Sequence, residues 1–178
     1  MGEESVITSE RRFRRATMAD LPTMLKIYEY ARKLMASNGN PTQWGDKFPR
    51  EEVVRDDVES QRTVLLVDTV DGKERVLAQF ALCPGVDPTY VNIDGAWLDD
   101  DPYVTIHRIA SSGLAKGAAK DCINWCIEHY GNVRADTHPN NKAMQHVLES
   151  NGFARCGLIQ LLDRPSDTTR IAYQRHEW

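Results

Sequence analysis

The segment from Tyr103 to Phe153 restricts the fold more than any other part of the chain. An extended run, Tyr103 to Ala110, leads into a turn of small residues over 111–119, and a helix follows. The first amides of a helix have no partner inside the helix, and the helix dipole favours negative charge there. A strand that passes through such a turn into a helix is typical of a pyrophosphate site. The segment therefore predicts a nucleotide-like ligand.

The remaining elements follow from hydrophobic periodicity and from turn residues. Helices are expected over 21–37, 50–60, 115–130 and 141–150, and strands over 12–16, 63–70, 75–82, 103–110, 133–137, 154–162 and 170–175. Asp71-Gly72 predicts a hairpin between the two apolar strands beside it. Residues 84–101, rich in Pro, Gly and Asp, predict a loop or a short irregular hairpin that could lie over a site. This order predicts one mixed sheet with helices on both faces, in the α+β or α/β class.

Length and charge limit the number of domains and the kind of partner. A chain of 178 residues is long enough for one well-buried core and short for two. We expect a flexible N-terminus over 1–10 and a single domain over 11–178. The net charge of −4 leaves no basic excess for nucleic acid or an anionic membrane, so neither partner is expected. No apolar run approaches the roughly 20 residues that cross a bilayer, and no signal peptide is recognisable, which predicts a cytoplasmic protein.

The four cysteines predict buried free thiols. Cys122 and Cys126 lie four residues apart in an apolar helical pattern, whereas Cys83 and Cys156 are isolated. A metal site would require closer cysteine pairs with histidine partners. A disulfide is not expected in a protein of the reducing cytoplasm. No metal is expected.

Two motifs in the segment 103–153 carry a family resemblance. The turn lacks the spacing of a G-x-G-x-x-G dinucleotide motif and the Gly-Lys-Ser/Thr ending of a P-loop. The order of elements over residues 12–175 instead resembles the GCN5-related N-acetyltransferase (GNAT) superfamily, in which a Gln/Arg-x-x-Gly-x-Gly/Ala loop binds the pyrophosphate of acetyl-coenzyme A. Gly117 and Ala119 match this loop, with Leu114 at the Gln/Arg position. The run from Asn141 to Phe153 resembles the family's Asn-led helix that ends in Gly-Phe.

The resemblance implies an α+β fold with α/β/α layers and a mostly antiparallel sheet in which one parallel strand pair splays apart. It also implies acetyl-coenzyme A as co-substrate, with the backbone amide of Ile109 as the donor that polarises the thioester carbonyl. Asn141 would contact the coenzyme or merely cap its helix. The residues expected to bind the coenzyme are Ile109, Ala110, Leu114, Ala115, Lys116, Gly117, Ala118, Ala119 and Asn141.

Candidates for proton transfer follow from the chemistry of an amine acceptor. An amine is protonated at neutral pH and must lose a proton before it attacks, and His107 and His138 are the best candidate bases, although either could instead be structural. The family often has a Tyr that protonates the departing thiolate, and Leu148 occupies that position here. Tyr173 is the candidate substitute, with Tyr103 as a second choice.

Acceptor-binding candidates lie in or beside loops. Trp44 and Trp97 could wall an acceptor pocket or cap the edge of the core. Asp136 could bind the amine or orient His138, and Arg108 could bind an acidic substrate group, with ordinary salt bridges as the alternative for both. The acidic run Asp99 to Asp101 is compatible with a cationic acceptor or with a solvated loop.

The leading hypothesis is an enzyme, an N-acetyltransferase that moves the acetyl group of acetyl-coenzyme A directly to a primary amine in a ternary complex. The acceptor would be a small molecule or a peptide, and homodimerisation is compatible with the resemblance. A noncatalytic acyl-coenzyme A sensor and a structural domain without coenzyme remain the alternatives. Coenzyme binding and thiol release with amines would discriminate between them.

Overall fold

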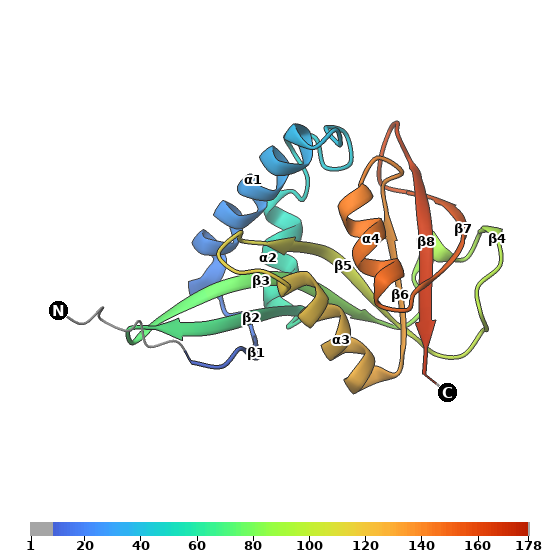
Figure 1. The fold of residues 1–178 in the computed structure, drawn as a ribbon. Helices are drawn as coiled ribbons and strands as arrows, with labels where there is room; N and C mark the ends of the chain where they lie inside the picture. The colour runs from blue at the N-terminus through green and yellow to red at the C-terminus, as the bar shows by residue number, and fades with distance from the viewer. Residues whose placement is uncertain (1–8, 178) are drawn as a thin grey trace.

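A single twisted sheet organises the computed structural model, which describes residues 9–177 (Figure 1). Within this range the sheet has eight strands in the order β1-β2-β3-β5-β6-β8-β7-β4. The strands are β1 (Arg12–Arg15), β2 (Thr63–Val70), β3 (Lys73–Pro84), β4 (Asp94–Gly95), β5 (Val104–Ser111), β6 (Asn132–Thr137), β7 (Ala154–Gln160) and β8 (Thr169–His176). All neighbouring pairs are antiparallel except β5 and β6, which are parallel.

Helices cover both faces of the sheet. They are α1 (Leu21–Ser37), α2 (Glu51–Glu59), α3 (Ala118–Tyr130) and α4 (Lys142–Ser150), with short 3-10 turns η1 (Met18–Asp20) and η2 (Pro88–Tyr90). Because strand side chains alternate, Leu66 and Phe80 pack with α3 and α4, whereas Leu65 and Val67 pack with α1 and α2. Burial of each such side chain contributes about 2 kcal/mol. Figure 1 shows the resulting layers, and the expected α+β fold is confirmed.

The parallel strand pair splays apart, as the family resemblance implies. β5 and β6 are paired only at Val104 with Val133 and at Thr105 with Arg134. Further along β5, the pairing with β3 changes register between Gln79 and Ala81. Because β6 continues to Thr137 without a β5 partner, a gap opens in the sheet on the side of the α3 and α4 N-termini.

Two local differences from the sequence prediction have clear backbone causes. Helix α3 begins at Ala118 rather than at 115, because Gly117 adopts a left-handed conformation (φ 73°) that ends the turn. The loop over 84–101 contains η2 and the short strand β4, which pairs with β7 rather than forming a hairpin of its own.

The N-terminal and cysteine expectations have mixed outcomes. Residues 1–8 of the expected flexible N-terminus lie outside the described residues, and the Ser9 amide donates to the Thr69 carbonyl at 2.8 Å. All four cysteines are free thiols, and burial raises the pKa of Cys126 to about 12. Cys122 and Cys126 are buried as expected, whereas Cys83 and Cys156 are half-buried. Among the described helices, none has both the length and the apolarity that a membrane span requires.

Candidate active site

A cavity of about 450 Å³ lies at the gap between β5 and β6. At one end it is lined by the apolar side chains of Ile123, Met144 and Leu148, which come from α3 and α4. Its remaining lining includes most of the polar side chains and comes from the end of α1 and the loop after it, from the loop after β3, from β5 and β6, from the start of α4, and from the loop between β7 and β8. The cavity therefore has lining from both helical layers and joins an apolar end to a polar end.

A bulge in β5 at Arg108 borders this cavity. Arg108 has φ 55°, an uncommon value for a residue other than glycine. Its side chain donates to both carboxylate oxygens of buried Asp57, at 2.7 and 2.9 Å, and its carbonyl accepts from the Tyr28 hydroxyl at 3.0 Å. Burial alone would lower the pKa of Arg108, but the Asp57 carboxylate outweighs it and raises the pKa. Arg108 therefore forms an ordinary salt bridge, which was the alternative to binding an acidic substrate group. This salt bridge also holds the bulge in place just before Ile109, a residue that lines the cavity.

An aspartate–histidine pair lies at the polar end of the cavity. The Nε2 atom of His107 is 2.5 Å from Oδ2 of Asp87, and both residues line the cavity. Asp87 is fixed in turn, because its Oδ1 accepts from the Thr89 amide at 2.9 Å. Burial raises the pKa of Asp87, but the His107 hydrogen bond and charge outweigh burial and leave the pKa below its ordinary value. With Nε2 bound to the carboxylate, the lone pair of His107 Nδ1 is left to accept a proton.

Asp136 also lines the cavity but does not orient His138. Its Oδ2 atom accepts from the Tyr90 hydroxyl at 2.6 Å. Tyr90 is buried, and burial together with the nearby Asp136 carboxylate raises the Tyr90 pKa well above its ordinary value. Tyr90 therefore stays a hydrogen-bond donor and holds the Asp136 carboxylate in place.

His138 lies outside the cavity lining, with both ring nitrogens engaged. Its Nε2 atom lies 2.9 and 3.1 Å from the carboxylate oxygens of Asp167, and its Nδ1 atom accepts from the Asn140 amide at 2.9 Å. This arrangement matches the structural alternative for His138 and leaves His107 as the histidine at the cavity.

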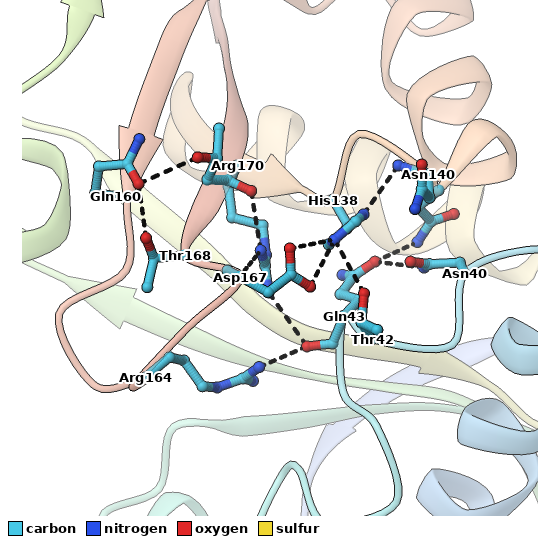
Figure 2. A network of polar contacts seen from close by, with 12 residues as sticks. Asn40, Thr42, Gln43, His138, Asn140, Gln160, Arg164, Asp167, Thr168 and Arg170 are labelled. Carbon is cyan, nitrogen blue, oxygen red and sulfur yellow. Dashed lines mark hydrogen bonds and ion pairs between the residues drawn. The ribbon is translucent and has the colours of Figure 1, made fainter.

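Gln43 connects three segments that are distant in sequence (Figure 2). Its backbone carbonyl accepts from Arg164 at 2.6 Å and from Arg170 at 3.3 Å. Its side-chain oxygen accepts from Asn40 at 2.8 Å and from Asn141 at 3.0 Å. The loop after α1, the start of α4 and the β7–β8 loop are thereby held together beside the cavity.

The turn before α3 has the features of an anion site. Gly117 is the residue that precedes the first helical turn, and a Cβ built on it would meet no atom closer than Nη1 of Arg11, at 4.0 Å. Arg11 donates to the Lys116 carbonyl at 2.7 Å and to the Asp121 carboxylate at 2.6 Å. The turn is therefore sterically open at its glycine and has a guanidinium beside it.

The other residues of this turn differ in exposure. The side chains of Leu114 and Lys116 are exposed, and Gly117 is an exposed position. Ala115 packs partly against the core, and Ala118 is buried. Ala119 is half-buried, and Ala110 is buried in the layer of α1 and α2.

The remaining sequence candidates divide into cavity residues and others. Asn141 caps α4, accepting from the Met144 amide at 3.0 Å, and it also lines the cavity, while its contact with the coenzyme stays a prediction. Trp44 is buried, lines the cavity and contacts Tyr28 edge-on.

Trp97 and Tyr173 do not line the cavity. The Trp97 ring lies 4.1 Å from the Arg134 guanidinium and its Nε1 donates to the Tyr90 carbonyl at 2.9 Å. Tyr173 is fully buried, and its hydroxyl lies 3.4 Å from Glu149. Their side chains therefore have packing partners elsewhere, away from the position that an acceptor wall or a general acid would take.

The acidic run at Asp99 is also remote from the cavity. Asp99 pairs with His176 at 2.8 Å, and Asp99, Asp101 and His176 bring ligand atoms within 4.8 Å of one another. Arg134 donates to the Asp99 carbonyl at 2.8 Å. This cluster lies by the start of β6 and the end of β8, whereas the cavity adjoins the end of β6.

Sequence reasoning missed several cavity residues, among them Asp87, Gln43, Arg164 and Arg170. The Pro- and Gly-rich character of 84–101 did indicate a loop over a site, and Asp87 lies in it. Nothing in the local sequence distinguishes the other three, because the contacts of Gln43 with Arg164, Arg170 and Asn141 span 121, 127 and 98 residues.

Comparison with solved structures identifies the fold. No protein-family model matches the chain, and no curated protein matches it in sequence. A GNAT-family acetyltransferase from Streptococcus agalactiae is 28% identical, covers 98% of this chain and 99% of its own, and has a TM-score of 0.82. A ribosomal-protein-alanine N-acetyltransferase from Brucella melitensis is 18% identical with a TM-score of 0.61, covering 93% of this chain and 99% of its own.

A phosphinothricin acetyltransferase from Sinorhizobium meliloti, solved with acetyl-coenzyme A, is 15% identical with a TM-score of 0.61 and covers 94% of this chain and 88% of its own. These two more distant structures share the fold, whereas the streptococcal one is also similar in sequence over nearly the whole chain. Together with the splayed strands and the open turn at Gly117, they show that the chain belongs to the GCN5-related N-acetyltransferase superfamily.

Proposed function

We propose that the protein is an acetyl-coenzyme A-dependent N-acetyltransferase that acetylates a primary amine by direct transfer in a ternary complex. The observation that carries the proposal is the Asp87–His107 pair at the polar end of the cavity between β5 and β6. A base with an oriented ring is what an amine acceptor requires, and a binding module has no need of one.

Four features support coenzyme binding. The first amides of α3 follow the open turn at Gly117, where a pyrophosphate would be stabilised. The apolar end of the cavity, at Ile123, Met144 and Leu148, suits a pantetheine arm. The Sinorhizobium relative with the same fold was solved with acetyl-coenzyme A. Arg11 stands beside the turn and supplies a basic group that Leu114, at the family's Gln/Arg position, does not.

The chemistry then follows from residues at the gap. The coenzyme supplies an acetyl thioester. Nδ1 of His107 accepts the proton of the amine, which is worth about 10²–10⁴ in rate, while Asp87 stabilises the imidazolium that forms. The backbone amide of Ile109, next to the bulge, donates to the thioester carbonyl oxygen as negative charge develops there. Such a donor raises the rate by a factor of about 10²–10³.

Completion of the transfer needs no side-chain acid. A C–N bond forms, the C–S bond breaks and the coenzyme departs as a thiolate. The ammonium gives up two protons, one before attack and one as the amide forms, and His107 passes each in turn to solvent. Leu148, at the family's Tyr position, lines the apolar end and offers no proton. A thiolate is stable enough to leave without one.

Calorimetric titration with acetyl-coenzyme A and measurement of thiol release with a panel of amines test the proposal. We expect micromolar binding and thiol release with at least some amines. Absence of millimolar or tighter binding by the folded protein would reject it. Binding without thiol release for any amine would favour the noncatalytic sensor.

A further inference from the structure

Two arginines at the polar end of the cavity lack a carboxylate partner. Arg170 is only 2% exposed, and it donates to the backbone carbonyls of Asp167, Thr169 and Gln43 at 2.7, 2.9 and 3.3 Å. Arg164 donates to the Gln43 carbonyl at 2.6 Å. Its guanidinium carbon lies 3.6 Å from the Phe48 ring centre, and its buried Nε has no partner among the described residues. Both side chains line the cavity, and Figure 2 shows their contacts with Gln43.

Within residues 9–177, neither guanidinium forms an ion pair, in contrast with Arg108, which is paired with Asp57. Carbonyl groups satisfy hydrogen bonds but carry no net charge, so neither positive charge has a direct counter-charge in this largely buried place. Burial lowers the pKa of both Arg164 and Arg170, because the nearby carboxylates do not offset the loss of water. An anionic group in the cavity would remove this imbalance.

The carboxylates closest to these arginines are engaged elsewhere or face solvent. Asp167 pairs with His138, and Asp136 accepts from Tyr90. Asp163 is exposed. Among the described residues, these carboxylates therefore act on Arg164 and Arg170 only without a direct ion pair.

The same cavity also holds the Asp87–His107 pair, which lines its wall. A cavity that combines this base with two arginines that form no ion pair is complementary to a molecule with an amine and an acidic group. Its volume of about 450 Å³, part of which the thioester arm would use, limits the ligand to a small molecule.

The contacts of Gln43 restrict the acceptor further. Its carbonyl ties the loop after α1 to Arg164 of the β7–β8 loop, and its side chain ties it to Asn141 of α4. A long peptide that crossed the polar end would have to break these contacts, whereas a small molecule would not.

We infer that the acceptor is a small amine that carries a carboxylate, with Arg164 and Arg170 as the carboxylate subsite and His107 at the amine. This inference rests on the proposed function and deepens it. A carboxylate is favoured over a neutral polar group because two guanidiniums present paired N–H donors to its two oxygens. The acidic run at Asp99, compatible in sequence with a cationic acceptor, lies at the other end of β6 and does not oppose the inference.

The test compares amines that differ only in the acidic group. Glycine, alanine, β-alanine and γ-aminobutyrate are assayed for thiol release beside their carboxamides and their phosphonate counterparts. We expect kcat/KM for the best carboxylate to exceed that of its carboxamide by about 100-fold, because an unpaired polar group in a built subsite is costly. The same ligands are titrated onto the protein in complex with coenzyme A, which reads acceptor binding without any transfer.

A matched pair of variants assigns the effect to the subsite. Arg164→Gln should lower kcat/KM for the carboxylate amine about 10-fold or more, mainly through KM, and leave the carboxamide within about twofold. Arg164→Lys should recover part of the loss, since it restores the charge without the planar fork. The control is Arg55→Gln, at an exposed position on α2 where the arginine pairs with Glu51. It should leave kcat/KM unchanged for both substrates.

The outcomes separate this inference from the proposed function. If the wild-type protein does not bind acetyl-coenzyme A, the proposed function itself is rejected. If coenzyme binding is normal but carboxylates and carboxamides have equal kcat/KM or equal affinity, the carboxylate subsite alone is overturned. A preference for phosphonates, or equal losses for both substrate classes in Arg164→Gln, would also overturn it.

Discussion

The imidazole of His107 is held by the carboxylate of Asp87, with 2.5 Å between Nε2 and Oδ2, at the wall of the cavity. His107 belongs to β5 and Asp87 to the loop after β3, so the pair links a strand of the splayed region to a loop over it. The link fixes which ring nitrogen is available as a base.

Replacement of His107 by Ala should lower kcat by about 10²–10⁴ and leave the affinity for acetyl-coenzyme A unchanged, because the ring acts on the amine rather than on the coenzyme. Steady-state thiol release and calorimetry measure the two effects. The control is His146→Ala, on the exposed face of α4. Equal activity of the two variants would remove His107 from the mechanism.

Replacement of Gly117 by Ala should weaken coenzyme binding about 10-fold or more, because the new Cβ occupies the open side of the turn and strains the left-handed backbone. Gly72→Ala is the matched control: it has a similar φ of 78° and equally open surroundings, but lies in the β2–β3 hairpin. Both variants should lose similar stability in thermal melts. If Gly72→Ala weakened binding equally, strain alone would explain the effect.

Replacement of Arg11 by Gln should weaken coenzyme binding several-fold, and more at low ionic strength, since a guanidinium beside a pyrophosphate acts largely through charge. Arg12→Gln, whose side chain instead pairs with Glu74, should leave the affinity unchanged. Calorimetry at two salt concentrations gives the comparison. A loss that does not depend on salt would argue against a direct charge effect.

Replacement of Asp57 by Ala should destabilise the fold by about 3 kcal/mol, because it leaves the Arg108 charge buried without its partner. It should also lower kcat, since the bulge before Ile109 loses its support. Asp56→Ala removes the neighbouring carboxylate, which is exposed, and should cost less than about 1 kcal/mol. Denaturant melts and kinetics are the measurements, and matching losses in both variants would contradict this role for Asp57.

Acid should remove the stabilising effect of Asp20. Its hydrogen bonds with Arg14, at 2.8 Å each, and with the Thr17 amide outweigh burial and lower the Asp20 pKa. A lowered carboxyl pKa stabilises the fold above the unfolded value of about 3.9, and the effect is lost as pH falls through the folded pKa. Asp20→Asn should therefore be about 1–2 kcal/mol less stable at neutral pH and approach the wild type below about pH 4.

Thermal melts from pH 7 to pH 2 follow this convergence. Asp100→Asn, at an exposed position, is the control and should track the wild type at every pH. A stability gap for Asp20→Asn that did not shrink in acid would show that the ion pair with Arg14 is not its source.

The sequence predicted the elements well where the information is local. The apolar strands around Asp71-Gly72 and the helix after Asn141 are both present, because turn and cap residues act on their neighbours. The start of α3 was misplaced, since the small residues before Gly117 are compatible with helix and only the left-handed glycine ends the turn.

The candidate site was less predictable because its contacts are not local. His107 could be proposed from the chain, but its partner Asp87 lies 20 residues away in an irregular loop. Gln43 and Arg164 meet across 121 residues, and no periodicity reports such a contact. Tyr173 was a reasonable candidate by residue type, yet its burial beneath α4 depends on the packing of the finished sheet.

The departure of β6 from β5 after Arg134 also has a kinetic consequence. If the thioester arm lies toward α3 and α4 and the amine toward the Asp87 loop, each reactant has its own side of the sheet. Coenzyme A should then compete with acetyl-coenzyme A but not with the amine, and double-reciprocal plots should intersect rather than run parallel. A few missing ladder hydrogen bonds would thus determine the inhibition pattern of the whole reaction.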